Sequence, residues 1–200
     1  MKNRWSRKEA SRFLVRYKAK WGAELALRTY ATRLLGAEPS LVLHGGGNTS
    51  VKGHCTNILG GRKAALFVKA SGFDMAAIEP EGHTALDFEY LLKLFNLDEL
   101  SNPQMLNELC THLFDFRSAT PSIESLVHAF IPKTFIDHTH ADSVLALTNR
   151  PDGERVVEDA LGKDVIILKY VKPGFDLAKA SAEAFSGNPD ARGMVWMNHG

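Results

Sequence analysis

The stretch Leu41-Val-Leu-His-Gly-Gly-Gly-Asn-Thr-Ser50 decides the fold prediction, because an apolar run passes directly into a run of glycines. Residues 41–44 predict a short strand, and the glycines predict a loop at its end. Bare backbone N–H groups in such a loop can approach and hold a phosphate, although a plain turn explains the glycines equally well. The Gly-Lys-Ser/Thr ending of a Walker loop is missing, so the stretch does not predict an ATP site.

Helical and extended patterns alternate on both sides of this stretch. Apolar spacing predicts two helices within residues 7–36, interrupted at Gly22. Further strands are predicted around Val51 and at 57–59, 65–68, 134–137, 165–168 and 194–197. Further helices are predicted at 87–96, 103–116, 141–148, 153–161 and 176–186, and one that starts near Ser122 as its N-cap. This layout predicts an α/β fold in which helices cover the faces of a sheet.

The composition is typical of one folded domain spanning residues 1–200. Hydrophobic residues make up 44% of the chain and charged residues 24%, and no Gly, Ser or Pro-rich linker divides it. The formal net charge of +1 gives no electrostatic reason to expect a nucleic-acid or membrane partner. Two cysteines, no signal peptide and no transmembrane run predict a cytoplasmic protein.

Three histidines form a candidate metal site. In Phe135-Ile-Asp-His-Thr-His140, His138 and His140 are two residues apart at the end of a predicted strand, so both rings face the same side. His199 follows the last apolar run. Three imidazoles with an open fourth position are typical of a catalytic metal site. An HxH pair alone would be as consistent with ordinary core or surface histidines as with metal binding. The remaining histidines have no comparable partner by spacing: His44, His54, His83, His112 and His128.

Two further segments could join the glycine loop in holding an anion. Lys69-Ala-Ser-Gly72 ends another predicted strand and offers a cation, a hydroxyl group and a flexible backbone. Ser122, at the start of a predicted helix, would add the positive end of a helix dipole. Glu124 falls in the first turn of that helix, where a carboxylate that merely favours the dipole is the alternative interpretation.

Five motifs in this order, GGGNTSV, KASG, PSIESLVHAF, FIDHTHAD and NHG, resemble the class II aldolase and adducin-head family. The resemblance extends from about Leu25 to the end of the chain. It implies a three-layer α/β/α fold with a central, mostly antiparallel sheet. The chain is most similar to the aldolase part of bifunctional rhamnulose-1-phosphate aldolase/short-chain dehydrogenase (lactaldehyde dehydrogenase) proteins, although no GxGxxG fingerprint occurs. Because the chain ends directly after an apolar run, we expect a domain truncated at its C-terminal end.

The resemblance also assigns site residues, position by position. The family's zinc ligands fall on His138, His140 and His199, and its catalytic glutamate falls on Glu124. Its phosphate-binding positions fall on Gly47, Asn48, Ser71, Gly72 and Ser122. Ile123 replaces a second phosphate-binding serine and Gly45 replaces a threonine of the fuculose-phosphate branch, so the phosphate contacts or the sugar would differ.

The implied activity is that of a zinc-dependent aldehyde-lyase. It would cleave a rhamnulose 1-phosphate-like ketose to dihydroxyacetone phosphate and lactaldehyde through an enediolate stabilised by Zn²⁺ or another divalent metal. Glu124 would move the proton. The alternatives are a pentulose-phosphate 4-epimerase of the same family and a non-enzymatic adducin-like interaction module, which lacks the metal ligands. We expect a small sugar phosphate as the partner and a homo-oligomer, such as the family's fourfold-symmetric tetramer.

Overall fold

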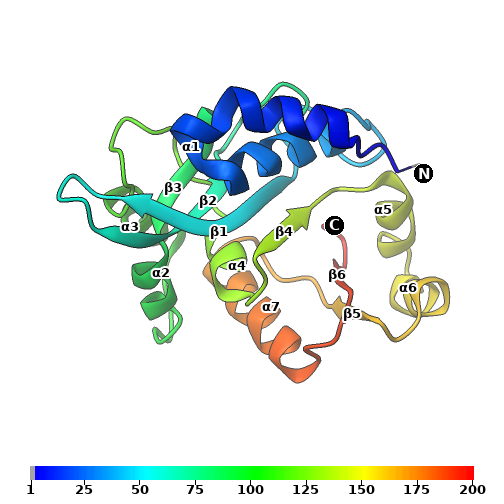
Figure 1. The fold of residues 1–200 in the computed structure, drawn as a ribbon. Helices are drawn as coiled ribbons and strands as arrows, with labels where there is room; N and C mark the ends of the chain where they lie inside the picture. Colours follow the sequence, from blue (N-terminus) through cyan, green and yellow to red (C-terminus); the bar gives the residue numbers. More distant parts are fainter. Residues whose placement is uncertain (1–2) are drawn as a thin grey trace.

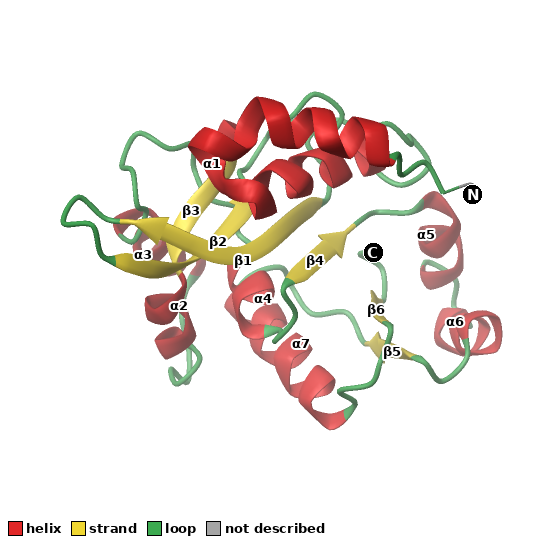
Figure 2. Cartoon of the chain, in the orientation of Figure 1, coloured by secondary structure: helices red, strands yellow, loops and turns green. Residues whose placement is uncertain are grey.

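The computed structural model describes residues 3–200, and its centre is a four-stranded antiparallel sheet (Figure 1). The strand order is β3-β2-β1-β4. The strands are β1 (Asn48–Thr56), β2 (Arg62–Lys69), β3 (His83–Asp87) and β4 (Phe135–His138). Helices and strands mix along the chain (Figure 2), which confirms the predicted α/β fold with a central antiparallel sheet.

Helices cover both faces of this sheet (Figure 1). On one face lies α1 (Arg7–Gly36), and its Leu25 packs with Val51 and Phe67. On the other face, Leu66 and Val68 pack against α2, α4 and α7. Because neighbouring residues of β2 enter opposite cores, this strand is buried on both sides. The helices of the second face are α2 (Phe88–Leu94), α4 (Ser125–Phe130) and α7 (Phe175–Gly187).

A second, smaller sheet carries the C-terminal part of the site. Its two parallel strands are β5 (Val165–Leu168) and β6 (Gly193–Trp196), and α7 forms the crossover that parallel strands require. The remaining helices are α3 (Asn102–Thr111), α5 (Asp142–Thr148), α6 (Gly153–Leu161) and the 3₁₀ turn η1 (Pro80–Gly82). β4 and β6 therefore belong to two different sheets and do not share one sheet edge.

The predicted interruption of the first helix at Gly22 is confirmed. Gly22 has φ 81° and ψ 163°, a left-handed backbone conformation that favours glycine. The chain therefore breaks α1 into two helical segments, which lie over the sheet in Figure 1. No helix within residues 3–200 combines the length and the hydropathy that a membrane span requires.

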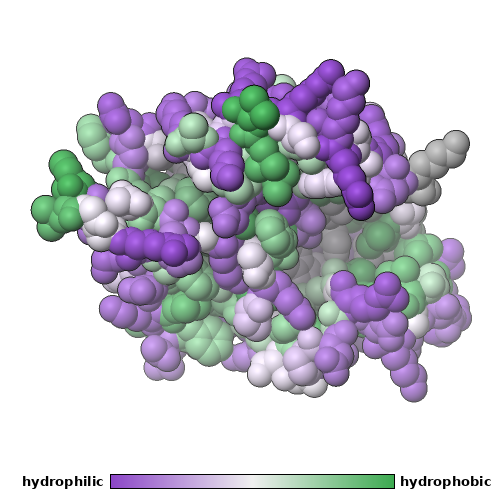
Figure 3. All heavy atoms as spheres, viewed as in Figure 1, coloured by the Kyte–Doolittle hydropathy of each residue, from purple (hydrophilic) through white to green (hydrophobic). Residues whose placement is uncertain are grey.

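Two predicted strands are wrong. Residues 41–44 form turns, in which the Leu41 N–H donates to Glu38 and the Leu41 carbonyl accepts from the N–H of His140. Val42 is buried by packing rather than by strand pairing, which explains why an apolar run misled the prediction. Residues 57–59 are the tip of the β1–β2 hairpin, where the exposed Ile58 and Leu59 form the apolar group at the left edge of Figure 3.

β3 and β4 also differ from expectation. The sequence does not predict β3, which pairs with β2 and is almost fully buried at His83 and Thr84. The apolar residues of the predicted strand 134–137 suggest a buried strand, but Phe135 of β4 is 54% exposed and only His138 of this strand is buried. β4 pairs only with β1 and is therefore an edge strand of the sheet, of which only the C-terminal end, at His138, is buried.

Candidate functional site

The three predicted metal ligands lie together, although they come from two sheets. His138 ends β4, His140 follows two residues later, and His199 follows β6. Each ring offers one nitrogen, and these nitrogens all lie within 4.8 Å of one another. The β1–β4 register places Asn48 directly opposite His138, so the glycine loop before Asn48 reaches the same place.

Three ring nitrogens in this cluster have no hydrogen-bond partner within residues 3–200. They are Nε2 of His138, Nε2 of His140 and Nδ1 of His199, and all three are buried. Buried polar atoms nearly always have partners, so three unpaired nitrogens in one cluster require an explanation. Burial lowers the pKa of His140, which favours the neutral imidazole that binds metals. The residues present therefore fit a divalent metal ion.

Glu124 lies between two of these histidines. Its Oε2 is 3.0 Å from Nδ1 of His138, and its Oε1 is 3.1 Å from Nε2 of His199. Burial raises the pKa of Glu124, but the hydrogen bonds from His138 and His199 outweigh burial and hold that pKa well below its usual range. The site therefore contains an ionised carboxylate that orients the imidazoles, an arrangement common around bound metals.

Asn48 and Ser122 direct their side chains toward Glu124. The Nδ2 of Asn48 donates to Glu124 Oε2 at 2.6 Å and to Ser122 Oγ at 3.1 Å. Ser122 Oγ also accepts from the Glu124 backbone N–H at 3.2 Å. The prediction that Ser122 is the N-cap of α4 is therefore wrong. A turn stabilised by the Ser122 hydroxyl group precedes the helix, and Glu124 takes the cap position.

His128 belongs to this cluster, although sequence spacing gave it no partner. It is 1% exposed on α4, with Nδ1 2.8 Å from Ser50 Oγ and Nε2 hydrogen-bonded to Asn48 Oδ1. Burial lowers its pKa to about 3, so the ring is neutral. The signal available in the sequence was a polar residue within the apolar run SLVHAF, one helical turn after Glu124.

The predicted anion-binding segments also meet. A Cβ atom built on Gly45 would lie 3.3 Å from Gly72 Cα, so the two loops are in close contact. The Ser71 N–H donates to the Thr120 carbonyl at 3.0 Å, which places the segment before Ser122 beside them. Ser71 and Gly72 are exposed, so this face is open to a ligand.

Lys69 is a buried cation beside these loops. It is 2% exposed, and among the described residues its Nζ donates only to the backbone oxygens of Gly45, at 3.0 Å, and Ala70, at 3.4 Å. Burial lowers its pKa, while Glu124 and Asp74 act in the opposite direction. Because no carboxylate of the described residues is in direct contact with this ammonium group, it is suited to pair with an anionic ligand.

Gly47 allows the glycine loop to pack closely against the end of β4. Its φ of 63° is left-handed, and an added Cβ would lie 2.7 Å from the His138 carbonyl oxygen and 2.7 Å from Val42 Cγ1. We expect Gly47→Ala to lower the free energy of unfolding by roughly 2–4 kcal/mol, because backbone strain adds to overpacking. Urea unfolding measures this change.

The matched control is Gly60→Ala. Gly60 has φ 80°, but no atom of residues 3–200 lies within 4 Å of its added Cβ, so only backbone strain of about 1 kcal/mol is expected. Equal losses of stability in both variants would contradict the steric explanation for Gly47.

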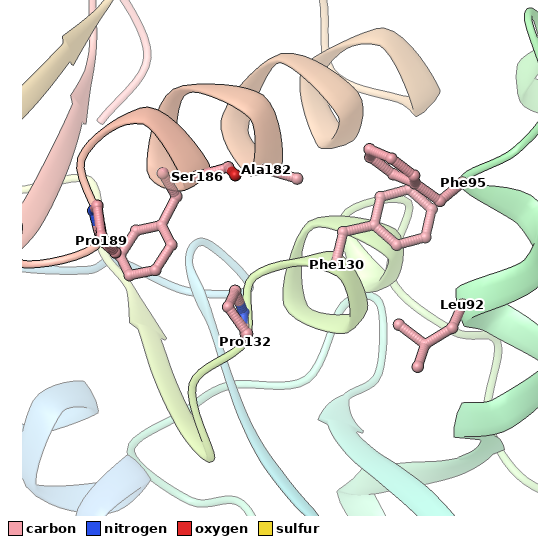
Figure 4. Close-up of a pocket in the computed structure, with 8 residues that line it drawn as sticks. Leu92, Phe95, Phe130, Pro132, Ala182, Ser186 and Pro189 are labelled. Carbon is pink, nitrogen blue, oxygen red and sulfur yellow. The ribbon is translucent and has the colours of Figure 1, made fainter.

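An apolar groove of about 410 Å³ lies outside this site (Figure 4). Its walls come from α2, α4 and α7, and Phe95 and Phe130 meet edge to face at 5.2 Å. No ionisable side chain lines it, so it offers no acid, base or metal ligand. A second cavity of about 700 Å³ opens between β4 and β6 and reaches His138 from the side of Trp196.

Comparison with known proteins identifies relatives of this chain. Residues 27–200 match the family model of the class II aldolase and adducin N-terminal domain. A solved structure, the N-terminal class II aldolase domain of a conserved protein from Thermoplasma acidophilum, is similar with a TM-score of 0.86 and 32% identity, over 100% of this chain and 87% of that one. YgbL from Klebsiella pneumoniae, a putative aldolase/epimerase/decarboxylase, shares the fold with a TM-score of 0.53 and 17% identity, over 88% of this chain and 77% of that one.

A curated relative, the uncharacterized oxidoreductase YuxG of Bacillus subtilis (strain 168), is 32% identical over 171 residues. The aligned region covers 86% of this chain but only 25% of YuxG. The chain therefore spans about a quarter of the length of this relative.

Proposed function

Because the chain belongs to the class II aldolase and adducin N-terminal domain family, we propose that it is a metal-dependent aldehyde-lyase. It cleaves a ketose 1-phosphate of the rhamnulose 1-phosphate type into dihydroxyacetone phosphate and lactaldehyde. The observation that carries this proposal is the cluster of three buried, unpaired ring nitrogens beside the ionised Glu124. A purely adducin-like interaction module would need neither feature.

The metal would be held by His138, His140 and His199, and zinc suits three imidazole ligands with an open fourth position. When bound, such an ion supplies positive charge that stabilises negative charge developing on the substrate oxygens. His138 is buried, His140 and His199 are half-buried, and the three unpaired ring nitrogens are themselves shielded from solvent, which strengthens this electrostatic effect.

Glu124 would transfer the proton. In the condensation direction its carboxylate takes a proton from the hydroxymethyl carbon of dihydroxyacetone phosphate, and in cleavage the carboxyl group returns a proton to the same carbon. Three contacts orient the carboxylate for this task, from His138, His199 and Asn48. The low pKa of Glu124 keeps it in the basic form before substrate binds.

The substrate phosphate would lie against the glycine loop at Gly47 and the exposed turn at Ser71 and Gly72. The contact between the two loops and the unpaired charge of Lys69 support this placement. Lys69 is an addition to the phosphate-binding positions predicted from the sequence. Asn48 and Ser122 lie between the proposed phosphate site and Glu124. Asn48 contacts both the Glu124 carboxylate and Ser122, so these two residues would link phosphate binding to proton transfer.

We expect Lys69→Met to raise the KM for dihydroxyacetone phosphate by roughly 10- to 100-fold, because a charged hydrogen bond is lost. Methionine is similar in length, so the core loses the charge and little volume. The KM comes from solvent deuterium exchange into dihydroxyacetone phosphate. The control is Lys63→Met, which removes an exposed lysine from the same strand, and an equal rise in both variants would argue against the role of Lys69.

The proposed function is tested by incubating the zinc-loaded protein with rhamnulose 1-phosphate and measuring the release of dihydroxyacetone phosphate. A pentulose 5-phosphate is assayed in parallel for inversion at its fourth carbon. Release of the triose phosphate supports the aldolase. Inversion without release would replace it with the 4-epimerase, and neither reaction in a metal-binding protein would refute both.

The length of a relative bears on what the whole protein does. YuxG is named an oxidoreductase and is much longer than the region that matches this chain. This supports the proposal that residues 1–200 form one aldolase domain of a protein that also oxidises the aldehyde. We further propose that the domain works as a homo-oligomer, which sedimentation of the purified chain tests directly.

A further inference from the structure

A buried chain of hydrogen bonds leads to Glu124 from the far side of the metal-binding cluster. It runs from Ser50 through His128 and Asn48 to the carboxylate. Ser50, His128 and Asn48 are 1%, 1% and 4% exposed, so water does not compete for these contacts. β1 supplies Ser50 and Asn48, and α4 supplies His128.

The direction of each hydrogen bond follows from its ends. Asn48 Nδ2 lies 2.6 Å from Glu124 Oε2 and 3.1 Å from Ser122 Oγ, and a carboxylate oxygen accepts hydrogen bonds, so the NH₂ group of Asn48 points to this side. The carbonyl oxygen of Asn48 then faces His128 and needs a donor. His128 must therefore carry its proton on Nε2, and its Nδ1 accepts from the hydroxyl group of Ser50 at 2.8 Å.

With the proton of His128 on Nε2, turning the Asn48 amide around would break two contacts at once. Its oxygen would then face the carboxylate of Glu124, while its NH₂ group would face the N–H of His128. Both contacts would be repulsive in a buried environment. His128 thus holds the amide in the one orientation that stabilises the charged form of Glu124.

We propose that His128 is a positioning residue, which acts through the amide of Asn48 to hold the Glu124 carboxylate in place for proton transfer. This inference rests on the proposed function, because it assigns His128 a task in the same reaction. His128 itself touches neither the substrate nor the metal in this assignment. Its contribution is the Nε2–H donor and the correct tautomer.

A buried histidine with a merely structural role provides the comparison. His83 on β3 is 3% exposed, yet its only side-chain hydrogen bond within residues 3–200 is a long one of 3.4 Å to Thr32 Oγ. Its Nδ1 has no partner in the same residues. His83→Leu therefore removes a buried imidazole of the same kind without touching the chain of hydrogen bonds that ends at Glu124.

The first test needs no activity. Long-range ¹H–¹⁵N correlation spectra of the metal-free protein, labelled at histidine, identify which nitrogen of His128 is protonated. We expect the proton on Nε2, and in protein also labelled with ¹⁵N at asparagine we expect the Asn48 side-chain amide signals to shift in His128→Leu but not in His83→Leu. A proton on Nδ1, or Asn48 signals unchanged in His128→Leu, would overturn the proposal.

The second test compares two substitutions of His128 in deuterium exchange into dihydroxyacetone phosphate. His128→Leu, which keeps apolar volume but removes the donor, is expected to lower kcat by roughly 10- to 100-fold with KM changed less than about threefold. His128→Gln can still donate an N–H toward Asn48 and is expected to recover most of the loss. His83→Leu is expected to lower stability but leave kcat unchanged.

These outcomes separate the inference from the proposed function. If the wild-type protein shows no exchange, the proposed function fails, while the tautomer and the Asn48 amide signals still decide whether His128 orients the amide. If the wild type is active and His128→Leu has normal kcat, the inference fails and the proposed function stands. Equal loss of kcat in the Leu and Gln variants would also contradict it, since the donor would then not matter.

Discussion

His138→Ala is expected to abolish the binding of the one divalent ion that we propose for the wild-type chain. The substitution removes one of three nitrogens that lie within 4.8 Å of one another, and it also takes away a hydrogen bond to Glu124. The variant therefore lacks one metal ligand and also the contact through which Glu124 orients that ligand. The affinity for zinc should fall by more than the roughly 10- to 100-fold that removal of an outer-shell partner alone produces.

Elemental analysis of the purified proteins, together with zinc titration of the metal-free forms, measures this effect. The matched control is His54→Ala, which removes an exposed histidine from β1 far from the cluster. About one zinc per chain in the control and none in His138→Ala would establish the site. Unchanged zinc content in His138→Ala would mean that the ion binds elsewhere.

Glu124→Gln should keep the metal and lose proton exchange from dihydroxyacetone phosphate by about 10²- to 10⁴-fold, the contribution of a general acid–base group. Glutamine has the same shape as glutamate, so packing against His138 and Asn48 is preserved. The amide cannot take up the proton, which is why catalysis is lost while the site remains assembled. Proton NMR in deuterated water follows the exchange directly.

The control for this variant is Glu89→Gln. Glu89 is an exposed carboxylate in the first turn of α2 and so has the ordinary, helix-favouring role that was the alternative for Glu124. Normal exchange in Glu124→Gln would remove that residue from the reaction. Loss of both metal and exchange would instead assign Glu124 to metal binding.

The grouping of the three candidate metal ligands could be predicted from the sequence because their signals are local. His138 and His140 are two residues apart at a strand end, and each of the two predicted strands before the histidines forms, shifted by one residue. The sequence did not indicate that β6 pairs with β5 and not with the central sheet. Strand partners depend on tertiary packing, which periodicity along a single strand does not contain.

The role of Asn48 was harder to predict. A glycine-asparagine motif indicates a loop, and the backbone of that loop does approach the exposed turn at Gly72. The Asn48 side chain, however, turns inward to Glu124 because His128 and Ser122 offer it buried partners. Those partners come from distant parts of the chain, so no spacing rule connects them to Asn48.

Element boundaries show the same limit. The helices at 141–148 and 153–161 were predicted to within one residue, because amphipathic spacing determines them. The apolar run 41–44 was taken for a strand, yet it packs as a turn beside the end of β4. An apolar run shows that a segment is buried, but not whether its backbone finds a strand partner.

The separation of the two sheets has a consequence for the dynamics of the protein. β4 and β6 belong to different hydrogen-bonded units, and the metal-binding cluster is where the side chains that follow them converge. An ion held there would cross-link the two sheets in addition to the apolar core that they share, and so would oppose local opening of β5 and β6. Binding of the ion and packing of the β5–β6 sheet against the rest of the domain would then be linked, so that this sheet opens less often as the ion concentration rises.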